Sequence, residues 1–162
     1  MFIVLDTGPL GDLVNPFDNP ETRAIRSWMR AHLARGVRFL LPEIADYEVR
    51  RSDILNELNS PFGPCPGSAA LYLLDQLKAV ITYEPLTTPT MLLAARLWAE
   101  KRKGTAEGDP ERHPKLDADI IITAQAIQKS NGHEPVVIAT MNLKDFLFSP
   151  TPTVTANEWH LI

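Results

Sequence analysis

The sequence has little of several features that define large classes of protein. One cysteine in 162 residues excludes a disulfide within the chain and favours a reducing compartment, the cytoplasm by default. No apolar run approaches the ~20 residues that a membrane-spanning helix needs, so no membrane association is expected. Basic residues are not in excess, because the formal net charge is −4, and a protein that coats nucleic acid would usually be basic.

What is present is an alternation of short apolar runs with helical patterns, and a hydrophobic fraction of 44% indicates a globular chain. Strands are predicted at 2–5, 37–41, 79–83, 135–139 and 153–155, the last near an edge. Helices are predicted at 20–35, 42–58, 68–78, 88–103 and 116–130, with at most a short one at 7–14 and loops at 59–67 and 105–115. We therefore expect one α/β domain over residues 1–162, a three-layer sandwich whose mostly parallel sheet is flanked by helices.

Two acidic residues follow predicted strands, where ligands bind in open α/β sheets. Asp6 comes directly after the run at 2–5, and its alternative role is a helix N-cap. Asp145 lies just past the strand at 135–139, close to the polar residues Thr140 and Asn142. For Asp145 the alternative is the acid of a capping box that begins at Asn142.

A third acid lies on the helix predicted at 42–58. Glu48 falls at the edge of a stripe with helical spacing that is predicted to face inward and consists of Ile44, Tyr47, Arg51, Leu55 and Leu58. A carboxylate that faces the core needs a cation or donors. Arg51 is the i+3 neighbour of Glu48, so the alternative is a salt bridge, which can coexist with a role near a metal.

The fourth acid, Asp119, is predicted in the first turn of the helix at 116–130. It shares a face with Ile122 and Thr123, so it is expected to point inward. The helix dipole by itself also favours an acid there. Asp117 lies roughly 160–200° away around the helix and is interpreted as the N-cap, with an outer metal contact as the alternative.

Four acids from separated segments are thus predicted at one side of the sheet. Clustered carboxylates repel one another and raise each other's pKa unless a cation neutralises them. Oxygen ligands suit Mg²⁺ or Mn²⁺. The four histidines are scattered and offer no zinc set with the single cysteine.

A basic group, Lys101 to Lys103, precedes the loop at 105–115. Such residues can contact phosphates. We favour an ordinary solvated helix end, because basic residues suit the last turn of a helix and the loop carries Glu107, Asp109 and Glu111.

Taken together, the sequence resembles the PIN-domain nucleases, especially their VapC-like toxin branch. The matching stretches are Phe-Ile-Val-Leu-Asp-Thr-Gly-Pro-Leu at 2–10, Leu-Pro-Glu-Ile-Ala-Asp-Tyr-Glu-Val-Arg-Arg at 41–51, Asp-Ile-Ile-Ile-Thr-Ala-Gln-Ala at 119–126 and Val-Ile-Ala-Thr-Met-Asn-Leu-Lys-Asp-Phe at 137–146. No one stretch is specific, but the ordered set spans nearly the whole chain.

The resemblance implies a parallel sheet flanked by helices and a ribonuclease that cleaves RNA with Mg²⁺ or Mn²⁺. It implies an acidic metal site of Asp6, Glu48, Asp119 and Asp145, with Thr7, Thr140 and Asn142 as polar supports. Many such proteins are toxins that a small antitoxin neutralises, and many are homodimers.

Three alternatives remain to be weighed. A haloacid-dehalogenase phosphatase needs a second acid two residues after the first, where this sequence has Gly8. A phosphate-accepting receiver domain needs paired acids before the first strand-end aspartate, and too few residues precede Asp6 to supply them. The third alternative is a PIN-type module that binds RNA or protein with little or no catalysis, which the presence of all four acids argues against.

Overall fold

The computed structural model describes residues 1–59, 69–103, 117–146 and 151–162. The described strands are β1 Phe2–Leu5, β2 Arg38–Pro42, β3 Thr82–Glu84, β4 Val136–Thr140 and β5 Val154–Glu158. The described helices are α1 Thr7–Val14, α2 Pro20–Ala34, α3 Glu43–Leu58, α4 Ala69–Lys78, α5 Thr88–Lys101 and α6 Asp117–Ser130, with short 3₁₀ helices η3 Leu143–Phe146 and η4 Trp159–Leu161. The predicted loops at 59–67 and 105–115 lie outside these residues, except for Asn59. In the described part of the chain, no helix is both long and apolar enough to cross a membrane.

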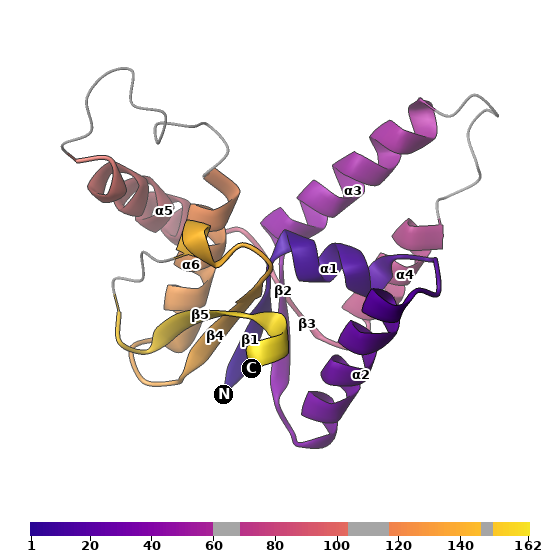
Figure 1. Ribbon diagram of the computed structural model, residues 1–162. Helices are drawn as coiled ribbons and strands as arrows, with labels where there is room; N and C mark the ends of the chain where they lie inside the picture. Colours follow the sequence, from indigo (N-terminus) through magenta and orange to yellow (C-terminus); the bar gives the residue numbers. More distant parts are fainter. Residues whose placement is uncertain (60–68, 104–116, 147–150) are drawn as a thin grey trace.

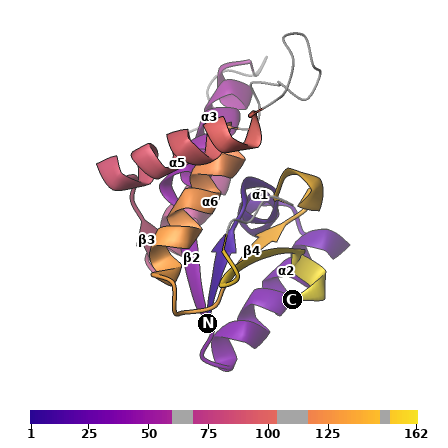
Figure 2. The same ribbon diagram turned by 90° about the vertical axis from the view of Figure 1, so that its left-hand side faces the viewer.

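The strands form one sheet in the order β3-β2-β1-β4-β5, and every neighbouring pair is parallel. The prediction of a mostly parallel sheet with its last strand at an edge is confirmed. Helices α1, α2 and α4 lie on one side of the sheet and α5 and α6 on the other (Figures 1 and 2). Because the strands are parallel, all of their carboxyl ends meet at one edge of the sheet.

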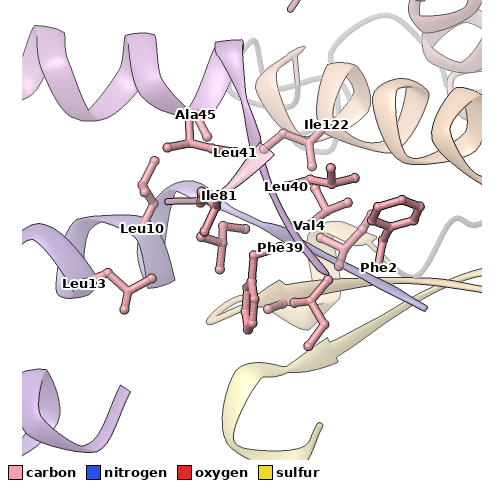
Figure 3. Close-up of a cluster of buried hydrophobic side chains, with 14 of the residues drawn as sticks. Phe2, Val4, Leu10, Leu13, Phe39, Leu40, Leu41, Ala45, Ile81 and Ile122 are labelled. Atoms are coloured by element: carbon pink, nitrogen blue, oxygen red, sulfur yellow. The ribbon is translucent and has the colours of Figure 1, made fainter. Parts of the chain in front are cut away.

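The core lies on both faces of the central strands. All four residues of β1 are buried, as expected for a parallel strand covered by helices on both sides. Figure 3 shows Leu10 of α1 on one side of β2 and Ile122 of α6 on the other, and both side chains are fully buried. This packing fixes the ends of β1 and β2 relative to the starts of α1 and α6.

Two helix starts were predicted from a cap followed by proline, and one needs correction. Asn19 is the N-cap of α2, because its Oδ1 accepts the Thr22 N–H at 2.8 Å. For α5 the cap is Thr87, not Thr88, and its hydroxyl accepts the Thr90 N–H at 3.2 Å. Pro89 therefore occupies the second helical position, where it is tolerated because the first-turn N–H groups need no partner within the helix.

The predicted inward stripe of α3 is wrong over most of its length. The buried residues of α3 are Ala45, Asp46 and Val49. Leu55 and Leu58 are 57% and 75% exposed. The first half of α3 packs against neighbouring helices, whereas its second half extends beyond the sheet (Figure 1), so its apolar spacing meets no core.

Candidate active site

Asp6 stands at the carboxyl end of the central strand and is also the N-cap of α1. Its Oδ1 accepts the Thr7 N–H at 2.6 Å, and its Oδ2 accepts the Thr140 hydroxyl at 2.7 Å. The residue is 8% exposed. Burial raises the pKa of Asp6, although the hydrogen bonds from Thr140 and Thr7 act in the opposite direction. The capping alternative is thus correct, and it coexists with a position at the strand end.

Glu48 approaches Asp6 through the side chain of Thr7. The Thr7 hydroxyl donates to Glu48 Oε2 at 2.8 Å, while the Thr7 N–H serves Asp6. Arg51 donates to Glu48 Oε1 at 2.7 Å, so the predicted i+3 salt bridge is present. Thr7 and Arg51 therefore each hold one of the two carboxylate oxygens of Glu48.

Asp145 lies in η3, directly after β4. The Asn142 side-chain amide donates to the Asp145 carboxylate. The Asn142 N–H, which a capping-box acid would accept, is instead bound to the Thr140 hydroxyl oxygen at 2.9 Å, so the capping-box interpretation is wrong. Thr140 is fully buried and connects Asp6 to the start of η3, because its hydroxyl donates to one and accepts from the other.

Asp119 is half-buried in the first turn of α6. Burial and the negative charges of Asp6, Asp145 and Glu48 raise its pKa to about 7, against a smaller lowering by Lys101. Figure 1 shows the starts of α1, α3 and α6 together with η3 at the same end of the sheet. The four predicted acids therefore lie close enough to influence one another electrostatically.

The position of Asp117 differs slightly from the prediction. It is the first residue of α6, whereas it was predicted to precede the helix as its N-cap. Helix ends shift by one or two residues between definitions, so the difference concerns the boundary alone.

The four acids affect one another electrostatically, but their described positions do not form a metal coordination shell. Among the described residues, no three His, Cys, Asp or Glu side chains are close enough to hold one metal ion. Glu48 and Asp145 are turned toward Arg51 and Asn142 instead. In the same part of the chain, Asp6, Asp119 and Asp145 form no ion pair.

The donor set fits a hard divalent cation by its chemistry. All four side chains offer carboxylate oxygens, the ligands that Mg²⁺ and Mn²⁺ prefer. The raised pKa of Asp119 shows that its negative charge is poorly compensated, which a cation would correct. Glu48 and Asp145 would have to rotate toward Asp6 and Asp119 to complete the site.

Two features near the acids were not predicted from the sequence. A groove of about 610 Å³ runs past Thr7 and Glu48 and reaches Phe17, whose side chain is exposed. The ammonium group of Lys101 contacts the backbone of Asp145, although its sequence context indicated a solvated helix end. Neither the groove nor the Lys101 contact can be predicted from neighbouring residues in the sequence, because each is formed by segments that are distant along the chain.

Comparisons with known proteins identify the fold. No protein-family model matches the sequence, and no curated protein matches it. Several solved structures match over almost all of the chain, among them the following three. DNA-bound VapBC from Salmonella typhimurium has a TM-score of 0.62 at 18% identity and covers 98% of this chain and of its own. VapBC2 from Rickettsia felis, bound to a DNA fragment from its promoter, has a TM-score of 0.61 at 16% identity. The match covers 98% of this chain and 99% of the other. FitAcB from Neisseria gonorrhoeae has a TM-score of 0.58 at 20% identity, and the match covers 98% of this chain and 99% of the other.

The chain therefore has the fold of the VapC-like PIN domains, as the sequence resemblance implied. The matched structures are of the VapBC and FitAB toxin–antitoxin type. At 16–20% identity, the likeness shows the fold and leaves the activity to be argued from this chain's own residues.

Proposed function

We propose that this chain is a Mg²⁺- or Mn²⁺-dependent endoribonuclease that cleaves RNA phosphodiester bonds. Its catalytic and metal-binding residues are Asp6, Glu48, Asp119 and Asp145. The observation that carries the proposal is Asp119, a half-buried carboxyl whose pKa of about 7 results from burial and from three acids on other segments. Such a carboxyl needs a proton or a cation, and clusters of this kind mark functional sites more often than structural ones.

Each acid has a role that follows from its partners. A bound divalent ion would supply a water of lowered pKa and charge stabilisation at the scissile phosphate. Asp6 and Asp119 would bind the metal directly, Asp6 with its carboxylate oriented by Thr7 and Thr140. Glu48 and Asp145 would bind through water or orient the nucleophile.

Substitution of the two direct ligands tests the assignment. Asp6→Asn and Asp119→Asn are each expected to reduce Mn²⁺-dependent RNA cleavage at least ~100-fold, because loss of groups around metal ligands already costs 10–100-fold. Asp18→Asn is the matched control, since Asp18 is an exposed acid paired with Arg23. Circular dichroism checks that each variant is folded. Wild-type turnover in either site variant contradicts the proposal.

The competing proposal is a module of the same fold that binds RNA or protein without cleaving. All four acids are present, and three of them raise the pKa of Asp119, which favours catalysis. Titration of Mn²⁺ into the chain with a labelled single-stranded RNA separates the two functions. A nuclease gives products that EDTA abolishes, whereas a binding module gives a complex without products.

We also propose that the protein works in the cytoplasm with a small antitoxin-type partner and as a homodimer. The matched structures support a partner, because VapBC and FitAcB are complexes. The described surface carries two apolar grooves that suit such contacts. One of about 320 Å³ lies between α1, α2 and α4 and includes Val80, and one of about 390 Å³ lies between α5 and α6 and includes Met91.

Met91 and Trp98 place exposed apolar surface along the α5–α6 groove, so we assign this groove to the second copy. Met91→Glu is expected to convert the dimer to a monomer in size-exclusion chromatography with light scattering. Val80→Glu, in the other groove, is the control and leaves the dimer intact. A monomeric wild type, or a dimer that survives Met91→Glu, contradicts the assignment.

A further inference from the structure

Lys101 is the last residue of α5, yet its side chain turns back toward the candidate active site. Its Nζ donates a hydrogen bond to the backbone carbonyl of Asp145 at 3.1 Å, in partly buried surroundings. Its neighbours there include the buried Leu97 and Ile120, together with Thr123 of α6. A solvated lysine would keep its ammonium group in water, so this inward position needs a reason.

The segment that Lys101 holds is anchored at its end by the buried Phe146, whereas Asp145 itself is only partly buried. η3 is a 3₁₀ helix of four residues, and hydrogen bonds in such helices have poor geometry. A backbone bond at its start runs from the Asp145 N–H to the Asn142 carbonyl at 3.2 Å. Lys101 adds a bond across 44 residues of sequence, from a helix that packs against α6. It therefore fixes Asp145 relative to the helix that carries Asp119.

Two effects of Lys101 on a divalent ion oppose each other. Its positive charge repels a cation at the acidic cluster. Its hydrogen bond keeps the Asp145 segment near Asp119 and so reduces the ordering needed on binding. The sign of the change on removing the lysine therefore shows which effect is larger.

We propose that Lys101 is a positioning residue of this site, which holds the Asp145 backbone so that its carboxylate can rotate onto a divalent ion shared with Asp119. The inference rests on the proposed function, since it deepens the same site. It concerns a residue that donates to the main chain and does not itself touch the metal.

The test measures Mn²⁺ affinity by isothermal titration calorimetry, without RNA. Lys101→Met is expected to weaken Mn²⁺ binding about tenfold, in the range found for groups that orient metal ligands. Lys101→Arg keeps a charged donor of similar reach and is expected to restore affinity to within about threefold of wild type. Lys103→Met removes the same charge from an exposed neighbouring position and is expected to leave the affinity unchanged.

Amide hydrogen exchange at Asp145 and Phe146 gives a second readout in the absence of metal. Exchange should be faster in Lys101→Met and normal in Lys101→Arg and Lys103→Met. Unchanged or tighter Mn²⁺ binding in Lys101→Met overturns the inference and leaves the nuclease proposal standing. A wild type that binds no Mn²⁺ overturns both, which distinguishes the two failures.

Discussion

Two acidic clusters in the described part of the chain compensate their charge in opposite ways. Asp46 of α3 is 7% exposed, and its carboxylate pairs with Arg50 at 3.1 Å and with Lys78 at 3.4 Å. Asp6 is buried to a similar degree at 8% exposed, but among the described residues its carboxylate accepts hydrogen bonds from the neutral Thr7 N–H and Thr140 hydroxyl alone. Burial alone therefore does not determine whether a carboxylate in this fold has a basic side chain as its partner.

The difference separates an acid that basic side chains neutralise from one that has no basic partner among the described residues. At Asp46, two basic side chains from α3 and α4 connect the helices and neutralise the acid. Around Asp6 and Asp119, several carboxylates converge while the described lysines and arginines form no ion pair with these two. A cluster that is stabilising only when a cation arrives is the expected form of a metal site.

Removing the paired acid should have the largest effect on stability. Asp46→Ala leaves Lys78 without its carboxylate and Arg50 with only the exposed Asp75, so we expect a loss of about 3 kcal/mol in the free energy of unfolding. Urea denaturation measures the loss. Asp75→Ala is the control and should cost under about 1 kcal/mol, because the Asp75 side chain is 59% exposed. Equal losses in the two variants would show that the cluster has no buried centre.

A smaller loss is expected where an uncharged donor supports the site. Thr140→Val removes the hydroxyl that donates to Asp6 in buried surroundings and accepts from the Asn142 N–H in partly buried ones, and should cost about 2 kcal/mol. It should also raise the pKa of Asp6 further, because the Thr140 hydrogen bond lowers it. Urea denaturation and a carboxyl-carbon NMR titration measure the two effects. Thr155→Val, at an exposed position of β5, is the control, and an equal loss there would contradict the role of Thr140.

The same contrast explains how much could be predicted from the sequence. The apolar run at 2–5, the Asn19 cap and the strand-end position of Asp6 are local features, and all are present in the structure. The Glu48–Arg51 salt bridge could also be predicted from the sequence, because residues three apart on a helix are neighbours.

What the sequence did not provide depends on contacts between distant segments. The exposed Leu55 and Leu58 have the spacing of a buried stripe, but spacing cannot show where a helix leaves the core. Lys101 was interpreted as solvated because its partner, Asp145, lies 44 residues away. The convergence of the acids was predicted from their positions at strand ends and on helix faces and from the family resemblance. The absence of a group of three at coordination distance among the described residues was not predicted.

A pH-dependent gain in stability should follow from removing the charge of Asp119. Its folded pKa of about 7 lies above the unfolded value of about 3.9, so the wild type loses stability as pH rises from about 4 through 7. Asp119→Asn avoids this loss. We compare the free energy of unfolding of the variant with that of the wild type at each pH. Allowing for solvent screening of a half-buried group, this difference should favour the variant by about 1–2 kcal/mol more at pH 8 than at pH 4.

Urea denaturation at the two pH values, without metal, measures this gain. Saturating Mn²⁺ should remove the advantage at pH 8, because the ion stabilises the wild-type carboxylate. Asp18→Asn, at an exposed position, should show no such dependence on pH. A variant that is less stable than wild type at pH 8 would mean that Asp119 is compensated after all.

The smallest effect is expected at Glu48, the member of the site that does have a cation. Arg51 pairs with it at 2.7 Å but is 57% exposed, so Arg51→Gln should change the free energy of unfolding by less than about 0.5 kcal/mol. Because Arg51 competes with a metal for the same carboxylate, its loss should tighten Mn²⁺ binding about two- to threefold, measured by calorimetry. Arg23→Gln, which breaks an exposed pair remote from the site, should leave binding unchanged. If Arg51→Gln instead weakens Mn²⁺ binding, the arginine orients Glu48 for the metal. The rule that acids of this site lack a basic partner would then apply to Asp6 and Asp119 and not to Glu48.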